Sequence, residues 1–290
     1  MANGSQGNPQ CKICSGSKVV FYCKKDNACY YICKDCRSIF QHPLPSMSEM
    51  AEYANSQYKD GSYSDYINAR ELKYLHFRQR LKQFKAIFPN GRLLDVGCSC
   101  GYFMEVAMEN GFDTHGIELS EVAISAAQPL TRQRIVRGSV NDLGVLQIGN
   151  FDLVTAFDIL EHTEDPVKFL MQIKSILKKD GGVILSTPST GHVLRYILRG
   201  RWPMFQPMQH TMLFSSKSLS LAMNKAGFKN IRIATAYKSV TLEYLFQQIQ
   251  DYNPFIYNTF KRFKFLIPKR ILVKPLEINI GEILAIAVNQ

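Results

Sequence analysis

A short apolar strand runs directly into a glycine-rich turn and a helix in residues 93–103, LLDVGCSCGYF. Glycines allow a backbone to approach a ligand closely, and the free N–H groups at the start of the following helix favour a bound anion. The small residues fall at Gly97, Ser99 and Gly101, which is not the G-x-G-x-x-G spacing of a dinucleotide fingerprint. The stretch therefore predicts a ligand-binding turn and argues against a dehydrogenase.

Downstream of this turn, short apolar runs alternate with stretches of helical periodicity. After the first strand, we expect strands at 114–119, 134–137, 151–157, 182–186, 231–236 and 282–288. The helix between the fourth and fifth strands should begin at the N-cap Asp165 with Pro166 in its first turn. Its apolar stripe continues to Leu177, and Gly181 is the expected stop. This alternation predicts an α/β fold with a parallel sheet covered by helices.

Six of the eight cysteines lie near the N-terminus, in a chain with no sign of a disulfide framework. Two C-x2-C pairs, eighteen residues apart, consist of Cys11, Cys14, Cys33 and Cys36. Two such turns supply the four thiolates of a zinc ribbon, and a closed four-thiolate site would be structural. Cys23 and Cys29 lack the paired spacing, and we expect them in or beside two strands near 18–22 and 30–32. Six unrelated reduced thiols are the alternative.

The 290-residue chain has 46% hydrophobic and 20% charged residues, which is enough for a buried core. No run of about 18 apolar residues exists, so a transmembrane helix is not expected. The polar N-terminus lacks the layout of a signal peptide, and we expect a cytoplasmic protein, with peripheral contact at the inner face of the membrane as an option. The net charge of +11 favours an anionic partner, which includes nucleic acid, a membrane surface and a phosphorylated substrate.

Five segments agree with one family in order and content. They are LLDVGCSCGYF (93–103), GIELS (116–120), FDLVTAFDILEHTEDP (151–166), LKKDGGVILSTPS (177–189) and HTMLFSSKSLSLAMNKAGF (210–228). With the double C-x2-C and the FQHPLP that follows it (40–45), they resemble class I S-adenosylmethionine-dependent methyltransferases with an N-terminal zinc ribbon. Members of this kind act on bacterial sugars, surface polysaccharides and ubiquinone precursors.

The resemblance implies a Rossmann-like, seven-stranded, mostly parallel sheet with helices on both faces, preceded by a small four-Cys zinc ribbon. We expect a zinc ribbon at 1–45 and a linker with N-terminal helices at 46–90. The methyltransferase domain would follow at 91–290, with an insertion at about 241–280.

The resemblance also implies a site for S-adenosylmethionine at the carboxyl edge of the sheet. The implied cofactor-binding residues are Asp95, Gly97, Cys98, Gly101, Glu118, Leu119, Ser139, Val140 and Phe157. Asp95 would order the turn, Glu118 would hold the ribose, and Ser139 with Val140 would meet the adenine edge. Many relatives have Asp at the Ser139 position, and Ser99 replaces a commoner glycine.

Catalysis needs alignment of the acceptor with the methyl group, because methyl transfer is an in-line displacement. An oxygen acceptor also benefits from a general base, a role that suits histidine near neutral pH. The catalytic candidates are His162, after the fourth strand, and His210, after the fifth. Glu161 is expected to order the loop. The alternative for each histidine is a structural hydrogen bond.

Two further segments bear on the acceptor. Residues 192–209 contain Arg195, Arg199, Arg201 and Trp202, which suit a phosphorylated or sugar-bearing acceptor, or equally a solvated basic helix with a packed tryptophan. Residues 261–274 have six basic residues and no acid, which is typical of a membrane-proximal lid over a lipid-linked acceptor. A plain structural insertion is the alternative.

The sequence thus predicts methyl transfer to a small or lipid-linked hydroxylated acceptor, with a sugar as one option. An RNA methyltransferase that uses the zinc module and the basic surface is the first alternative. A catalytically idle binding protein is the second, although the intact set of turn and ribose residues argues against it.

Overall fold

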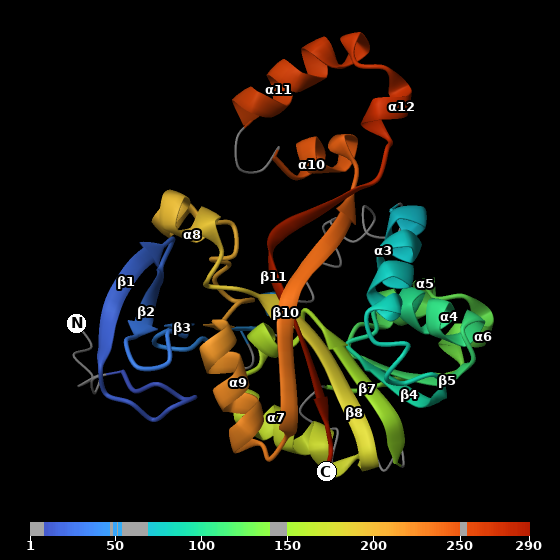
Figure 1. Cartoon of the computed structure of the whole chain (residues 1–290). Helices are drawn as coiled ribbons and strands as arrows, with labels where there is room; N and C mark the ends of the chain where they lie inside the picture. The colour runs from blue at the N-terminus through green and yellow to red at the C-terminus, as the bar shows by residue number, and fades with distance from the viewer. Residues whose placement is uncertain (1–8, 47–48, 51, 54–68, 140–149, 250–253) are drawn as a thin grey trace.

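The computed structural model describes residues 9–46, 49–50, 52–53, 69–139, 150–249 and 254–290. Figure 1 shows three parts: a small sheet near the N-terminus, a central sheet with helices on both faces, and a group of helices raised on two long strands. Among the described residues, no helix is both long and apolar enough to cross a bilayer.

The small sheet is antiparallel and has the order β1-β2-β3-β9. Its strands are β1 (Val19–Lys25), β2 (Ala28–Cys33), β3 (Ile39–Gln41) and β9 (Met212–Leu213). Cys23 lies in β1 and Cys29 in β2, as the spacing of the cysteines predicts. The fourth strand, β9, comes from far along the chain, so the N-terminal module completes its sheet with a piece of the large domain.

The large sheet has seven strands in the order β10-β11-β8-β7-β4-β5-β6. They are β4 (Gly91–Val96), β5 (Phe112–Glu118), β6 (Ile135–Arg137), β7 (Phe151–Phe157), β8 (Leu177–Pro188), β10 (Lys229–Val240) and β11 (Leu276–Val288). Strands β4 to β8 run parallel, and β11 is antiparallel to both β8 and β10. The expected Rossmann-like, mostly parallel sheet is confirmed.

Helices cover both faces because the strand side chains alternate between two cores. Leu94 and Val154 face α7 (Pro166–Ser175) and α9 (Ser216–Lys225). Their neighbours Leu93 and Leu153 face α3 (Arg70–Lys82) and α4 (Tyr102–Glu109). Two short helices, α5 (Glu121–Ala126) and α6 (Pro129–Arg132), lie between β5 and β6.

The predicted end of the helix after Asp165 is wrong. The Asp165 side chain does accept hydrogen bonds from the N–H groups of Val167 and Lys168, so α7 begins as expected. However, α7 ends at Ser175, and Leu177 starts β8 opposite Phe151. The N–H of Phe151 donates to the carbonyl of Ile176 at 2.9 Å. The backbone here is therefore paired with β7 and cannot continue the helix.

The last two strands extend beyond the sheet. Residues 282–288 of β11 pair with β8, whereas Leu276–Ile278 pair only with β10 among the described residues. This two-stranded stem carries α10 (Leu242–Ile249), α11 (Pro254–Phe263), a 3-10 turn (Lys264–Leu266) and α12 (Lys269–Leu272) above the body of the molecule (Figure 1). The interruption of the sheet is therefore shorter than the sequence suggests, at 241–275.

Candidate functional site

The turn after β4 requires left-handed backbone at three positions. Gly97 has a φ of 71°, Ser99 of 53° and Gly101 of 79°. A Cβ on Gly97 would lie 2.2 Å from the Ile159 side chain, and one on Gly101 would lie 2.3 Å from Thr131. Only glycine satisfies both the conformation and the space at these two positions. The turn thereby delivers the N-terminus of α4 to the carboxyl edge of the sheet, where ligands bind in open α/β folds.

Two buried carboxyl groups lie below and beside this turn. Asp95 accepts a hydrogen bond from the Thr155 hydroxyl at 2.7 Å, and burial raises the pKa of Asp95 to about 7. Glu118, at the end of β5, accepts from the N–H of Ser99 at 2.9 Å and of Ser120 at 2.8 Å. Burial raises the pKa of Glu118 as well. The structure thus brings the glycine turn and the acidic end of β5 together.

The remaining cofactor candidates that the structure describes lie at the same edge. Cys98 is buried in the turn, and Leu119 is 52% exposed next to Glu118. Phe157 ends β7 and packs edge-on against Phe103, with ring centroids 4.9 Å apart. Ser139 follows β6, and Val140 lies outside the described residues. This edge offers a carboxylate that can accept from ribose hydroxyls, an exposed apolar side chain and backbone N–H groups. These groups fit S-adenosylmethionine.

The two candidate histidines, His162 and His210, lie next to each other. His162 bonds to the carbonyl of Gln209, which is 47 positions further along the chain. The ring centroids of His162 and His210 are 5.1 Å apart. The Nδ1–H of His162 donates to the Gln209 carbonyl at 2.9 Å, and the Nδ1–H of His210 donates to the Met204 carbonyl at 2.8 Å. Because carbonyls only accept, both rings keep the lone pair on Nε2.

Glu161 completes this cluster. Its Oε2 accepts from the Thr187 hydroxyl at 2.9 Å, while its buried Oε1 has no hydrogen-bond partner among the residues that the structure describes. One ligand-type atom from each of Glu161, His162 and His210 lies within 4.8 Å of the others, so the three could also hold a metal ion. Burial raises the pKa of Glu161, and it lowers the pKa of His162. Burial and the neighbouring His162 lower the pKa of His210 to about 3.

A partly buried ionic network beside the cluster is not indicated by the sequence. Lys238 on β10 pairs with Asp158 at 3.0 Å and also contacts Glu282 on β11. Arg80 on α3 pairs with Glu282 at 3.4 Å. Burial by itself raises the pKa of Asp158. The positive charges of Lys238 and Arg80 outweigh burial and hold this pKa below its ordinary value. Three of the residues come from separate elements and Asp158 follows β7, where its backbone has a positive φ of 56°.

The basic aromatic segment after β8 is mainly structural. Trp202 is 1% exposed and packs edge-on against Phe205 at 5.4 Å. Buried Arg195 donates to the Tyr22 hydroxyl at 2.9 Å and contacts the Thr190 carbonyl. Of the two interpretations of this segment, the packed tryptophan holds, and Arg195 joins the small sheet to the large domain. Arg199 and Arg201 form a short 3-10 turn with no buried residue.

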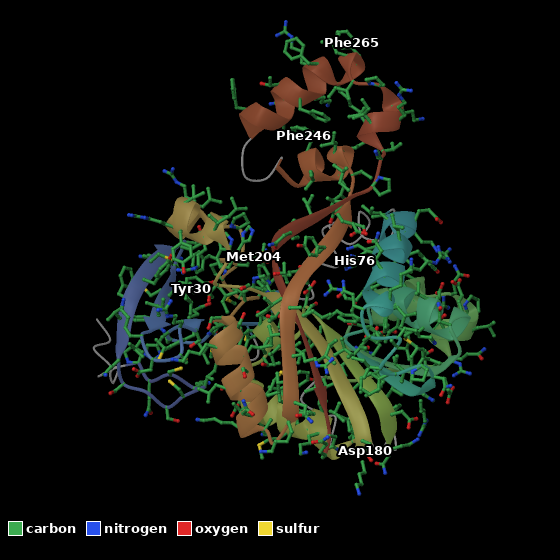
Figure 2. The ribbon with its side chains drawn as sticks, in the orientation of Figure 1. Tyr30, His76, Asp180, Met204, Phe246 and Phe265 are labelled. Carbon is green, nitrogen blue, oxygen red and sulfur yellow. The ribbon has the colours of Figure 1, made fainter. Side chains whose placement is uncertain are left out.

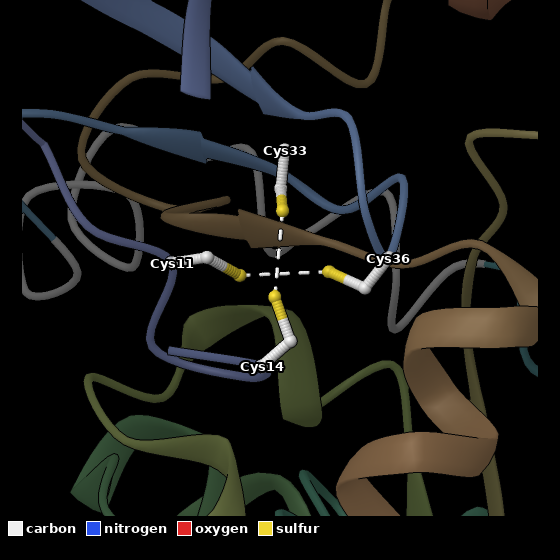
Figure 3. A group of neighbouring side chains, drawn as sticks. All are labelled: Cys11, Cys14, Cys33 and Cys36. Carbon is white, nitrogen blue, oxygen red and sulfur yellow. Dashed lines mark hydrogen bonds between the residues drawn. The ribbon is translucent and has the colours of Figure 1, made fainter. Parts of the chain in front are cut away.

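The four expected zinc ligands converge on one point (Figure 3). The Sγ atoms of Cys11 and Cys36 are 3.5 Å apart, and those of Cys14 and Cys33 are 3.4 Å apart. Sulfurs around a tetrahedral zinc with bonds of about 2.3 Å lie about 3.8 Å from one another, so the cluster needs little change to hold the ion. None of the four forms a disulfide. The geometry is consistent with a zinc site.

Comparisons with known proteins agree with this geometry. A family described as "Methyltransferase domain" matches residues 66–233. A ubiquinone biosynthesis O-methyltransferase of Xanthomonas campestris pv. campestris (strain B100) is 33% identical over 126 residues, which is 42% of this chain and 50% of that protein. One from Acinetobacter baylyi is 30% identical over 102 residues, 33% of this chain and 43% of that protein. The chain spans about half the length of these relatives.

Solved structures show the same fold at low sequence identity. A SAM-dependent methyltransferase from Archaeoglobus fulgidus aligns with a TM-score of 0.52 and 18% identity, covering 77% of this chain and 98% of that one. A possible histamine N-methyltransferase from Thermotoga maritima aligns with a TM-score of 0.51 and 18% identity, covering 79% and 95%. Since the family match spans more than half of the chain, this protein belongs to the methyltransferase domain family.

Proposed function

We propose that the enzyme methylates a hydroxyl group of an acceptor that is lipid-linked or presented at an anionic membrane surface, with a sugar or a ubiquinone precursor as the reacting part. The observation that supports an oxygen acceptor is the histidine cluster. Two neutral imidazoles and a carboxyl converge where the carboxyl ends of β7 and β8 meet, and such a set can hold and deprotonate a hydroxyl group.

The residues divide the work in this proposal. S-adenosylmethionine, when bound, supplies an electrophilic methyl group. Glu118 holds the ribose, and the turn at Gly97–Gly101 receives the methionine part. His162 takes the proton of the acceptor hydroxyl at Nε2, because its Nδ1–H is held by the Gln209 carbonyl. His210, whose pKa is about 3, accepts a hydrogen bond and orients the acceptor without taking the proton.

The helical extension supports the membrane part of the proposal. Phe246 of α10 stacks on Phe260 of α11, with ring centroids 3.6 Å apart. That contact leaves Phe255 (79% exposed) and Phe265 (80% exposed) at the surface, and Phe265 lies at the far tip in Figure 2. The segment 261–274 around it has six basic residues and no acid. Exposed aromatics among basic side chains favour the interface of an anionic bilayer.

The four-cysteine cluster belongs to the proposal as a structural zinc site. Four protein thiolates leave no open coordination position, so the ion would take no part in methyl transfer. Metal analysis of the purified protein should give one zinc per chain.

Cofactor binding comes first among the tests. Calorimetric titration of S-adenosylmethionine into zinc-analysed protein should show one site. Glu118→Ala should weaken binding at least about tenfold, because hydrogen bonds to a charged group contribute about 1.5–3 kcal/mol. Unaltered affinity in the variant would remove Glu118 from the cofactor site.

The acceptor is then sought by following S-adenosylhomocysteine formation with nucleotide sugars, lipid-linked sugars and ubiquinone precursors. His162→Ala should abolish turnover of the true acceptor while leaving cofactor affinity unchanged. Full turnover by the variant would exclude His162 as the base.

Flotation with vesicles tests the membrane surface. Binding should require anionic lipid and should fall with Phe265→Ser. The matched control is Phe21→Ser, which alters an exposed phenylalanine of β1 away from the extension. Equal binding to neutral vesicles would contradict the proposal. Tight binding to bulk RNA with a steep salt dependence would instead favour the RNA methyltransferase.

A further inference from the structure

The N-terminal module and the histidine cluster share one stretch of backbone, residues 209–215, which we call the bridging segment. On one side, the Gln209 carbonyl accepts the Nδ1–H of His162, and the N–H of Thr211 donates to the Glu161 carbonyl at 3.0 Å. His210 itself lies between these two contacts. The first half of the bridging segment therefore builds the histidine cluster.

On its other side, the bridging segment belongs to the small sheet. Met212 pairs with Phe40 and Leu213 pairs with Ile39, as β9 against β3. The N–H of Gln41 donates to the Thr211 carbonyl at 2.9 Å, so the pairing continues to the residue next to His210.

A direct bond joins the bridging segment to a metal-ligating cysteine. The Ser215 hydroxyl donates to the carbonyl of Cys36 at 2.9 Å. On either side of Cys36, the Lys217 ammonium donates to the Asp35 carbonyl at 2.7 Å, and the Thr190 hydroxyl donates to the Arg37 carbonyl at 3.2 Å. The second C-x2-C turn is thus tied to the large domain at three consecutive carbonyls.

The hydrophobic core also runs without a break from the four-cysteine cluster into the bridging segment. Cys11, Cys33 and Cys36 are buried in the main core together with Met212 and Phe214 of the bridging segment. Without an ion, the mutual repulsion of thiolates or the desolvation of thiols opposes so close a cluster, and the turn that presents the three carbonyls loses its anchor. On its other edge the bridging segment meets the large domain at Phe214, which bridges Ser189 and accepts from the N–H of Thr190 at 2.7 Å.

We propose that the zinc site is a positioning device for the acceptor histidines: metal in the four-cysteine cluster fixes the bridging segment through β3 and Cys36, and so holds His210 and the carbonyl that orients His162. His210 and Gln209 are positioning residues for this purpose. The claim about position stands apart from the reaction, and only its consequence for turnover rests on the proposed function.

Hydrogen exchange measured by mass spectrometry tests the proposal without an acceptor. Full-length protein, loaded with zinc or stripped by a chelator, is compared in the presence of saturating S-adenosylmethionine. Amide exchange in peptides covering 209–215 should accelerate at least about tenfold on zinc loss, because local opening becomes easier. Peptides covering 93–101 should keep their protection, and cofactor affinity should change less than about threefold.

Two cysteine variants form a matched pair. Cys36→Ser removes a ligand and should reproduce the exchange of the stripped protein, with altered NMR ring signals for His162 and His210. Cys23→Ser alters a β1 cysteine outside the cluster and should match the zinc-loaded wild type. Re-addition of zinc to the stripped wild type should restore protection, which separates the effect from failure to fold.

Two results would overturn the inference. Unchanged exchange at 209–215 after complete zinc loss would confine the metal to the N-terminal module. Loss of protection throughout the chain, with cofactor affinity falling in parallel, would assign the metal to global stability. Neither result bears on methyl transfer, which the acceptor screen tests separately.

Discussion

Two backbone carbonyls decide the chemistry of the histidine pair. Gln209 and Met204 each accept an Nδ1–H, so His162 and His210 present the same tautomer toward one another. In water a histidine exchanges between tautomers and protonates near pH 6.5. Here the fixed tautomer and the low pKa keep His210 neutral over the physiological range.

This burial links stability to pH. The pKa of His210 is about 3 in the folded protein and about 6.5 in the unfolded chain, so the unfolded state binds more protons between these values. Its contribution to stability is therefore present above pH 6.5 and lost as the pH falls toward 3. In His210→Gln, the free energy of unfolding should depend on pH less steeply, by about 1.4 kcal/mol per pH unit between pH 6 and pH 4. Urea unfolding at three pH values measures the slopes, and equal slopes would contradict a buried neutral ring.

The ionic network makes a second prediction for a single residue. Lys238→Met removes the ammonium that pairs with Asp158, whose side chain is 37% exposed, and with the buried Glu282. Arg80 and Lys73 remain near these carboxylates. Breaking a fully buried pair from one side costs about 3–5 kcal/mol in the free energy of unfolding, and the partial exposure of Lys238 and Asp158 lowers the expected cost to about 1–3 kcal/mol. Lys178→Met, which breaks the more exposed pair with Asp152, is the control and should cost about 1 kcal/mol or less. Similar losses in both variants would show that the network is no more important than a surface pair.

Single residues also mark the limit of reading the sequence. Asp95, Glu118 and the C-x2-C pairs are recognisable because their spacing along the chain is short and regular. The contact of His162 with His210, and the network around Lys238, depend on how distant elements pack. No local pattern encodes these contacts, although the sheet-edge position of each histidine follows from the strand order.

At the scale of elements, the two glycines that flank α4 can be compared in their backbone conformation and in the space around them. Gly101 and Gly111 both have positive φ, at 79° and 86°, but a Cβ on Gly111 would meet nothing within 4 Å. Gly111→Ala should therefore cost only the left-handed conformation, about 1–2 kcal/mol. In Gly101→Ala, the new methyl group must also displace Thr131. This variant should therefore lose more free energy of unfolding than Gly111→Ala, and it should also bind the cofactor more weakly. Urea unfolding and calorimetry of both variants check this, and equal effects would mean that Thr131 gives way freely.

The elements themselves are predictable to different degrees. Strand β7 matches its expected bounds because its apolar run is bounded clearly on both sides. The end of α7 is missed because Leu177 fits an apolar helical stripe and a buried strand equally well. Strands β10 and β11 are longer than expected because their outer residues pair with each other in a half-exposed stem, where the side chains follow no single burial pattern.

At the scale of the whole molecule, the four-cysteine module and the methyltransferase domain share a core, so the chain is continuous in packing across residue 45. A fragment covering 46–290 should fail to fold, because it loses the partner of β9 and exposes Met212 and Phe214. Replacement of 242–273 by a short turn is the control, since Val240 and Leu276 are paired neighbours. That variant should stay folded and bind S-adenosylmethionine by calorimetry. A folded, cofactor-binding 46–290 fragment would show that the module is dispensable.

The two-stranded stem of β10 and β11 is what connects the helical extension to the sheet. Its base combines a register shift between Ala236 and Lys238 with Gly281, whose φ is 97°, and a paired ribbon outside the sheet bends more easily than one held on both sides. Beyond this base, Ser239 is buried and bonds to α3, donating its N–H to His76 and its hydroxyl to Gln79. The distance between Phe265 and the cofactor edge of the sheet is therefore set by one hairpin and by its contacts with α3.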